Sequence, residues 1–79
     1  SLVLSWTENK DDDFESYRIY RSATSPVTIS SSLIKIINQQ STTSFTDADV
    51  LPSSHYFYNV FVFDKQGLYS PSLNEVSGP

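Results

Sequence analysis

The chain has 79 residues, no cysteine and a formal net charge of −4 at pH 7. This length suits one small domain, and the lack of cysteine excludes a disulfide framework and thiolate metal sites. Only five Lys and Arg residues are present, and they are scattered, which argues against nucleic-acid binding because that needs clustered basic side chains. No apolar run approaches the roughly 20 residues of a membrane helix, so we expect no membrane insertion.

The first strand is predicted at residues 2–6, where apolar and polar residues alternate. Alternation places Leu2, Leu4 and Trp6 on one face, and we expect this face to point into the core. A sugar-stacking role for Trp6 is disfavoured because the tryptophan shares this inward face. Residues 7–13 are polar and end in three aspartates, which predicts a solvated loop.

The second strand is predicted at residues 16–22. Tyr17 and Ile19 share one face of this strand, and Arg18 and Tyr20 share the other. The composition supports sheet rather than helix along the whole chain, because β-branched and aromatic residues, which suit a pleated and half-buried surface, dominate the apolar positions.

The middle of the chain is predicted to combine an irregular connection with two short strands. Residues 23–32 are rich in Ser and Thr and contain Pro26, which indicates an irregular connection. Residues 33–38 are expected to form a short strand, and residues 43–47 another one with Phe45 facing inward. Short strands with turn signals at this spacing are typical of an antiparallel sandwich.

A proline turn before the longest strand is the most informative feature of the chain. Residues 48–55 hold this turn, and Tyr56 follows Pro52 by four residues. In Greek-key sandwiches a tyrosine at such a corner packs its ring into the core and donates its hydroxyl proton to the backbone of the turn. We therefore expect Tyr56 to form a tyrosine corner.

The longest strand is predicted at residues 56–64 and carries aromatic side chains on both faces. One face comprises Tyr56, Tyr58, Val60 and Val62, and the other comprises Phe57, Asn59, Phe61 and Phe63. Beyond it, Gly67 is free to take the positive φ of a hairpin turn. The last strand, at residues 70–77, should be broken near Pro71, as suits an edge position. Residues 78–79 should begin a linker.

These elements predict an all-β fold, an immunoglobulin-like antiparallel β-sandwich with Greek-key connections, formed by residues 1–77. Its core should be built from the inward faces of the predicted strands. The predicted core residues are Leu2, Leu4, Trp6, Tyr17, Ile19, Phe45, Tyr56, Tyr58, Val60 and Val62.

Five stretches of the chain together resemble a fibronectin type III domain. They are residues 2–6 (LVLSW), 17–22 (YRIYRS), 43–47 (TSFTD), 50–60 (VLPSSHYFYNV) and 64–72 (DKQGLYSPS). Their order and spacing carry the resemblance, and their style is similar to that of the type III modules in multidomain bacterial exported proteins. The resemblance implies an extracellular or cell-surface location, with neighbouring domains of the same polypeptide as partners.

In one respect the sequence departs from the family that it resembles. The family begins with a strand that pairs beside the second one, whereas this chain opens directly on the second strand, at residues 2–6. The expected fold therefore lacks the first strand, or that strand lies upstream. We expect residues 2–6 to form an exposed edge that is prone to pairing with another copy.

No residues stand out as catalytic or metal-binding, and we expect no enzyme activity, metal ion or cofactor. The carboxylates of Asp11, Asp12 and Asp13 would suit calcium, but their spacing does not match an EF-hand and no glycine follows to make its turn. His55 is the only histidine. It lies in the predicted turn, where exposure disfavours a zinc site or a catalytic triad.

Arg18, Tyr20, Phe57, Phe61 and Phe63 are predicted to share the outer face of one sheet. Four aromatic residues on one solvent face are more than cross-strand pairing requires. Aromatic residues with an arginine are typical of docking surfaces, so this face is the predicted interaction site. The alternative is that the Ser-rich connection or the edge strands cover it.

The predicted function is that of a non-catalytic spacer or protein-interaction module of a larger exported protein. As a spacer, a sandwich with its ends at opposite poles would hold neighbouring domains apart. One alternative is an accessory carbohydrate- or polymer-binding module of a secreted hydrolase, which would need a flat row of exposed aromatic residues. The other is a receptor-like recognition domain of a cell-surface protein that uses the loops at one pole. The partners would be neighbouring domains, another protein or a polysaccharide.

Overall fold

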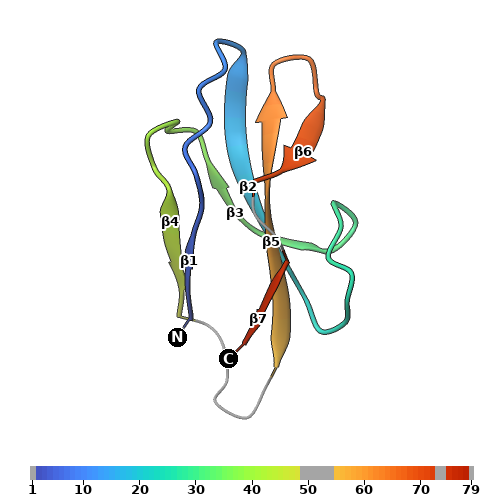
Figure 1. Ribbon diagram of the computed structural model, residues 1–79. Helices are drawn as coiled ribbons and strands as arrows, with labels where there is room; N and C mark the ends of the chain where they lie inside the picture. Colours follow the sequence, from blue (N-terminus) through green and yellow to red (C-terminus); the bar gives the residue numbers. More distant parts are fainter. Residues whose placement is uncertain (1, 49–54, 73–74, 79) are drawn as a thin grey trace.

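The computed structural model describes residues 2–48, 55–72 and 75–78, and these residues form seven strands and no helix (Figure 1). None of them lies in a helix that could span a membrane. The strands are β1 (Leu2–Ser5), β2 (Phe14–Ser22), β3 (Ser32–Ile37), β4 (Ser44–Asp47), β5 (Tyr56–Asp64), β6 (Tyr69–Pro71) and β7 (Val76–Gly78).

The strands form two antiparallel sheets that pack as a small β-sandwich, which confirms the predicted all-β fold. One sheet pairs β1 with β4, and the other has the order β3-β2-β5-β6, with β7 also paired to β5. The long central strands β2 and β5 run side by side from Phe14 opposite Asp64 to Ser22 opposite Phe57. They hold the second sheet together, because every other strand of that sheet pairs with one of them.

The strands follow the alternating segments of the sequence, and the turns follow the predicted breaks. The last predicted strand is split into β6 and β7, with Pro71 at the end of β6. Gly67 has a φ of 87° in the β5–β6 hairpin, a conformation that glycine reaches without a Cβ clash. The proline turn of the predicted tyrosine corner lies at residues 48–55, most of which is outside the described residues.

The core between the two sheets contains all ten of the predicted core residues. Leu4, Trp6, Tyr17, Ile19, Tyr58 and Val60 are buried, together with Ile37 from β3. The other four, Leu2, Phe45, Tyr56 and Val62, are partly buried and pack against this cluster. The rings of Trp6 and Tyr17 meet edge to face with centroids 5.4 Å apart, an arrangement that aromatic pairs prefer.

A buried polar cluster joins the two sheets at one pole of the sandwich. The Tyr58 hydroxyl donates to Oδ2 of Asp47 at 2.8 Å, and Nη1 of Arg21 donates to the same oxygen at 2.7 Å. These residues come from β5, β4 and β2, so one carboxylate links three strands. Asp47 is only 3% exposed, and a charge buried so deeply needs partners of this kind. We call these three residues the carboxylate clamp.

The first and last described residues lie at this same pole (Figure 1). A Cβ added to Gly78 would lie 3.1 Å from Cδ1 of Leu2, which places the two residues in contact. The strand directions explain this position. β7 is antiparallel to β5 and ends opposite Tyr56, where β5 begins, while β1 begins opposite Asp47 of the clamp.

Gly78 also corrects the predicted linker, because it is the last residue of β7 and not the start of a connection. Its backbone pairs with Tyr56. Its missing side chain leaves room for Leu2, since a Cβ at 3.1 Å would be closer than ordinary van der Waals contact. The ordered domain therefore extends one residue further than the sequence predicted.

One edge of β1 has no partner strand among the described residues. The backbone N–H of Trp6 donates to the Thr43 carbonyl across the β1–β4 pair. Successive residues of a strand point their backbone groups to opposite sides, so Val3 and Ser5 direct their N–H and C=O groups away from β4. Val3 is 65% exposed. No charged residue or proline lies in β1 to block pairing, whereas such devices protect most natural edges.

Replacing Tyr58 by Phe should lower the free energy of unfolding by about 2 kcal/mol, because a buried hydrogen bond to a carboxylate is lost. Urea unfolding would measure this change. Burial, with the hydrogen bond to Asp47, raises the pKa of Tyr58 from 10.0 to about 12. Because the folded-state pKa is the higher one, the stabilisation is complete below pH 10 and is lost as the pH rises toward about 12.

The alkaline loss of stability should therefore be smaller for Tyr58→Phe than for the unchanged protein. The difference between the two proteins is the measured quantity, because it isolates the contribution of Tyr58. Equal pH dependence of unfolding for both would contradict a protonated, hydrogen-bonded Tyr58.

The open edge of β1 predicts reversible self-association that Val3→Lys should suppress, because an edge lysine opposes strand pairing. Sedimentation velocity over a range of concentrations would measure the effect. Leu68→Lys is a matched control, since Leu68 is also 65% exposed but lies in the β5–β6 turn. A clean monomer at every concentration of the unchanged protein would sink the prediction.

Candidate functional site: the outer face of the five-stranded sheet

The five residues of the predicted interaction face do share one face of the second sheet, but most of them are not exposed. Tyr20, Phe61 and Phe63 are between 5% and 9% exposed and form a second apolar cluster with Val27. Phe57 is partly buried against this cluster, and Arg18 is partly buried beside it. The prediction of an open aromatic patch is therefore wrong for Tyr20, Phe61 and Phe63.

Ring contacts tie this second cluster together. The rings of Tyr20 and Phe61 meet edge to face with centroids 5.7 Å apart. Tyr69 of β6 stacks on Phe63 at 5.2 Å and meets Phe61 edge to face at 5.9 Å. From the neighbouring strand β2, Cζ of Arg18 lies 4.2 Å from the centroid of the Phe63 ring, a favourable cation–π distance. These contacts give the aromatic residues a packing role.

Arg18 is held in place by its own strand. Its guanidinium donates to Oγ of Ser16 at 3.2 Å and to Oε1 of Glu15 at 3.3 Å. The hydrogen bond from Ser16 lowers the pKa of Glu15, and the hydrogen bond and charge of Arg18 lower it further. The carboxylate therefore stays charged at neutral pH. The cation is already paired on this face, so it offers less to an incoming anion than an unpaired arginine would.

The cover over the cluster comes from residues 23–31, the Ser- and Thr-rich connection between β2 and β3. Val27 is 5% exposed and is the one buried member of the cluster that β2 and β5 do not supply. The Val27 N–H donates to Oε1 of Glu75 at 2.6 Å, and the Ser25 hydroxyl donates to Oε2. Of the two readings of this face, the structure supports the covered one.

The exposed apolar side chains of this face lie on its two edges. Leu33 and Ile36 of β3 stand opposite Tyr20 and Arg18 and are 43% and 44% exposed. Tyr69, at the other edge, is 50% exposed. Separate exposed apolar residues are normal on protein surfaces, so these positions mark the accessible part of the face without defining a continuous patch.

Three residues that shape this face are not among those predicted from the sequence: Val27, Tyr69 and Glu75. Val27 carried a usable signal, because it follows Pro26 as an apolar residue within a polar connection. Tyr69 pairs with Phe63 in the β5–β6 ladder and was left outside the predicted last strand. Glu75 had no local signal, since its partners Ser25 and Val27 are 50 and 48 residues away.

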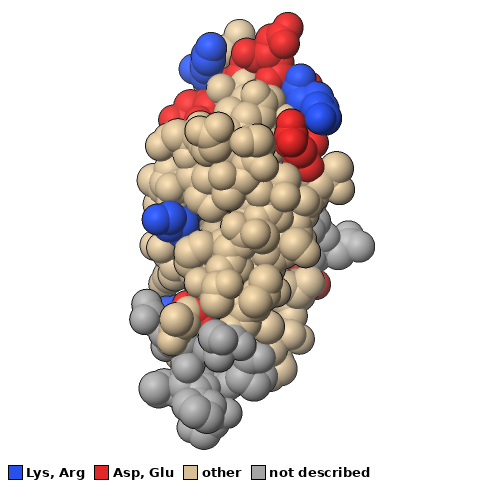
Figure 2. Space-filling model, turned by 90° about the vertical axis from the view of Figure 1, so that its left-hand side faces the viewer, with Lys and Arg blue, Asp and Glu red and all other residues tan. Residues whose placement is uncertain are grey.

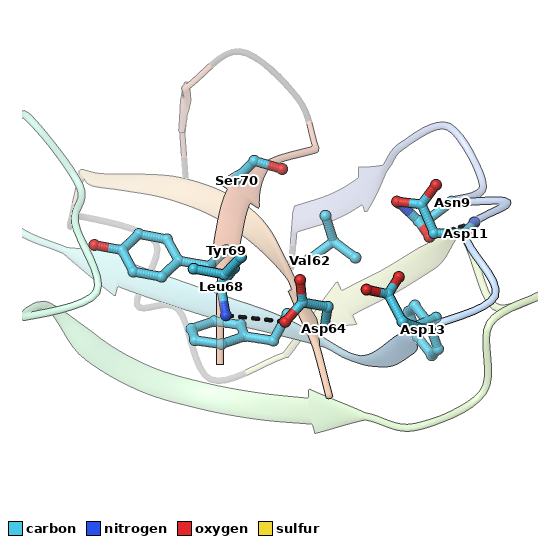
Figure 3. Close-up of a pocket in the computed structure, with 10 residues that line it drawn as sticks. Asn9, Asp11, Asp13, Val62, Asp64, Leu68, Tyr69 and Ser70 are labelled. Carbon is cyan, nitrogen blue, oxygen red and sulfur yellow. Dashed lines mark hydrogen bonds between the residues drawn. The ribbon is translucent and has the colours of Figure 1, made fainter. Parts of the chain in front are cut away.

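A small acidic pocket lies at the pole opposite the carboxylate clamp (Figure 3). Its volume is about 120 Å³, and it is lined by Asp11, Asp13 and Asp64 beside apolar side chains such as Phe14 and Tyr69. Oδ1 of Asp64 accepts the N–H groups of Gln66 and Leu68 at 2.9 and 3.0 Å. This carboxylate is therefore committed to the hairpin turn.

The calcium reading of residues 11–13 gains no support from this geometry. The three aspartates of this loop are exposed, and no group of three or more acidic or histidine side chains within the described residues could hold a metal ion. Asp11 instead accepts a hydrogen bond from Nδ2 of Asn9 at 3.4 Å. The backbone carbonyl of Asp13 accepts from Lys65, which ties the loop to the hairpin.

His55 and Trp6 lie where their sequence context predicted. His55 is exposed, and its ring meets Phe57 edge to face with centroids 5.4 Å apart. Trp6 is 8% exposed and packs in the core, where its indole N–H has no hydrogen-bond partner among the described residues.

A second hollow, of about 370 Å³, lies near the clamp and is lined by Arg21, Tyr56 and several serines. The guanidinium of Arg21 stacks over Tyr56 with Cζ 4.8 Å from the ring centroid. Burial alone lowers the pKa of Arg21, but the hydrogen bond and charge of Asp47 raise it above the ordinary value. Its charge is thus balanced by Asp47, and the hollow is not set up to attract an anion.

Charged side chains gather toward one end of the sandwich, whereas the middle of the side seen in Figure 2 is largely without them. The loop of residues 7–13 and the hairpin at residues 64–67 supply Glu8, Lys10, Asp11, Asp12, Asp13, Asp64 and Lys65. Acidic residues outnumber basic ones there. The domain therefore has an acid-rich pole, and the ends of the described chain lie at the other pole.

Phe61→Ser should lower the free energy of unfolding by about 3 kcal/mol, because the substitution removes a buried ring and places a hydroxyl in an apolar cluster. Leu33→Ser, on the same face but 43% exposed, should cost less than about 1 kcal/mol. Urea denaturation of both variants would measure the contrast. Equal, small effects would mean that the outer aromatic face is open to solvent after all.

No family model, curated protein or solved structure matches this chain.

Proposed function

We propose that this chain is a non-catalytic protein-interaction module of the fibronectin type III kind, within a larger exported protein. The sequence stretches described above and a sandwich of two antiparallel sheets support the type III assignment. The export assignment rests on the resemblance alone. Of the two roles that the resemblance implies, we favour interaction over spacing, because charged side chains gather at one pole of the domain.

The observation that carries this preference is the acid-rich pole, where the loop of residues 7–13 and the hairpin at residues 64–67 bring five carboxylates and two lysines together. The molecule measures 41 × 22 × 17 Å along its principal axes. The acid-rich pole lies away from the pole at which Leu2 contacts Gly78. The domain would present this charged end to partners.

The use of the polar residues also supports a non-catalytic role. The buried carboxylate of Asp47 is shared by Tyr58 and Arg21, and its position links the two sheets. Glu75 binds the connection over the outer face. These groups stabilise the fold, whereas a catalytic acid or base needs access to a substrate proton.

The polymer-binding alternative is less well supported, because it needs a flat row of exposed aromatic rings. Tyr20, Phe61 and Phe63 are buried, and Tyr69 is the one large aromatic residue that is exposed on this face within the described part of the chain. The receptor-like alternative would use the polar loop at residues 7–13, where the described residues supply no aromatic anchor.

A distance measurement between spin labels tests whether the acid-rich pole lies apart from the pole at which Leu2 contacts Gly78. The chain has no cysteine, so Val3→Cys and Ser77→Cys can be labelled uniquely, and both positions are exposed. We expect a separation far shorter than the 41 Å long axis. The matched pair Val3→Cys and Asp12→Cys, which joins β1 to the acid-rich pole, should give a longer distance, up to the roughly 32 Å between Cα atoms that nine extended residues can span.

Two outcomes would contradict the proposal. A long distance between the labels at residues 3 and 77 would contradict the arrangement of the two poles on which the proposal rests. Retention of the unchanged protein on an insoluble polysaccharide, lost on Tyr69→Ala, would favour the polymer-binding alternative instead.

A further inference from the structure

The connection at residues 23–31 is held by one buried side chain, Val27, and by hydrogen bonds to Glu75, which is distant in the sequence. We call these hydrogen bonds to Glu75 the latch. Of the apolar residues in this stretch, Val27 is buried in the second cluster, while Ile29 is 39% exposed. The connection contains no regular strand, since β2 ends at Ser22 and β3 begins at Ser32. Its hold on the sheet therefore depends on one valine side chain and on the hydrogen bonds to Glu75.

Both carboxylate oxygens of Glu75 are used by this connection. Oε1 accepts the Val27 N–H at 2.6 Å, and Oε2 accepts the Ser25 hydroxyl. Glu75 directly precedes β7, which is only three residues long and pairs with β5. The latch thus joins two short peripheral segments on the outside of the domain, and both belong to the class of elements that open locally before the core does.

We propose that residues 23–31 form a releasable strap, latched by Glu75, that covers the aromatic face of β2 and β5 and exposes it when the latch opens. The fold does not require the strap to stay closed. The main core, with Trp6, Tyr17 and Tyr58, lies between the two sheets and contains no residue of the strap. Opening would uncover Tyr20, Phe57 and Phe61 while the sandwich stays intact.

Protonation of Glu75 is the natural trigger. The hydrogen bonds from Ser25 and Val27 lower the pKa of Glu75, so the charged form is bound more tightly than the neutral one. The latch is therefore fully formed above the ordinary pKa of a glutamate. It weakens as the pH falls through the lowered pKa of Glu75. The strap itself carries no ionisable side chain.

Other titratable and charged groups near this face need to be separated from Glu75. Arg18 lies over Phe63 and is paired with Glu15, and Arg21 lies near the start of the strap but is paired with Asp47. His55 contacts Phe57, and the comparison with Glu75→Gln separates the two groups because this substitution leaves His55 unchanged.

Amide hydrogen exchange at Val27 reports directly on the latch, because the exchanging N–H is the one that Glu75 binds. Glu75→Gln keeps the shape of the side chain but removes its charge. We expect the protection of Val27 to fall at least about tenfold at pH 7, since charge-assisted hydrogen bonds are the stronger kind. Ser25→Ala, which removes one of the two bonds, should give a smaller fall, and Glu8→Gln should give none.

Two further readouts distinguish strap release from unfolding. Trp6, the single tryptophan, is buried in the main core, so its emission should not change in Glu75→Gln. A dye that binds exposed apolar surface should bind the variant at pH 7. It should bind the unchanged protein only in acid, once Glu75 is protonated.

Unchanged Val27 protection in Glu75→Gln would overturn the latch. A shift of Trp6 emission together with loss of protection would overturn the releasable strap, because the connection would then open only with the whole fold. Ser25→Ala keeps this test valid if Glu75→Gln does not fold, since graded loss of Val27 protection with constant Trp6 emission supports release, and no loss opposes it.

Discussion

The hydrogen bonds around Asp47 are the constraint on which the sandwich depends. The β1–β4 sheet has only two short strands, and a two-stranded sheet is marginal by itself. Its attachment to β2 and β5 comes from apolar packing of Leu4 and Trp6 and from one carboxylate that binds Tyr58 and Arg21. If the small sheet shifted on the large one, the buried carboxylate of Asp47 would lose its hydrogen bonds to Tyr58 and Arg21, which is costly. The clamp therefore fixes how the small sheet sits on the large one.

Strands β2 and β5 bury side chains on both of their faces, and this explains the aromatic content of so short a chain. One face supplies Tyr17 and Tyr58 to the core between the sheets, and the other supplies Tyr20 and Phe61 to the outer cluster. The irregular connection at residues 23–31 covers the outer cluster, where a third sheet or a helix would otherwise be needed. A 79-residue domain thus gains a second buried cluster without additional strands.

The sequence predicted what short-range patterns encode. Alternation placed Tyr58 and Val60 on one face and Phe57 and Phe61 on the other, and the glycine of the hairpin has the expected positive φ. The contacts that were missed are long-range. Nothing near Asp47 indicates that it will meet Tyr58, and nothing near Glu75 points to Val27, because such pairs are created by the packing of distant segments. The burial of the outer face depends on one of these contacts, so alternation could show which residues share the face but not whether water reaches it.

The adjacency of Leu2 and Gly78 has a mechanical consequence. A force applied between these two residues would pull β1 away from β4 and β7 away from β5, starting at the pole where Leu2 and Gly78 meet. In that geometry the hydrogen bonds between paired strands break one after another. When the load runs along the strands instead, many of these bonds share it at once. Tension applied at Leu2 and Gly78 would therefore separate β1 and β7 from their partner strands at low force.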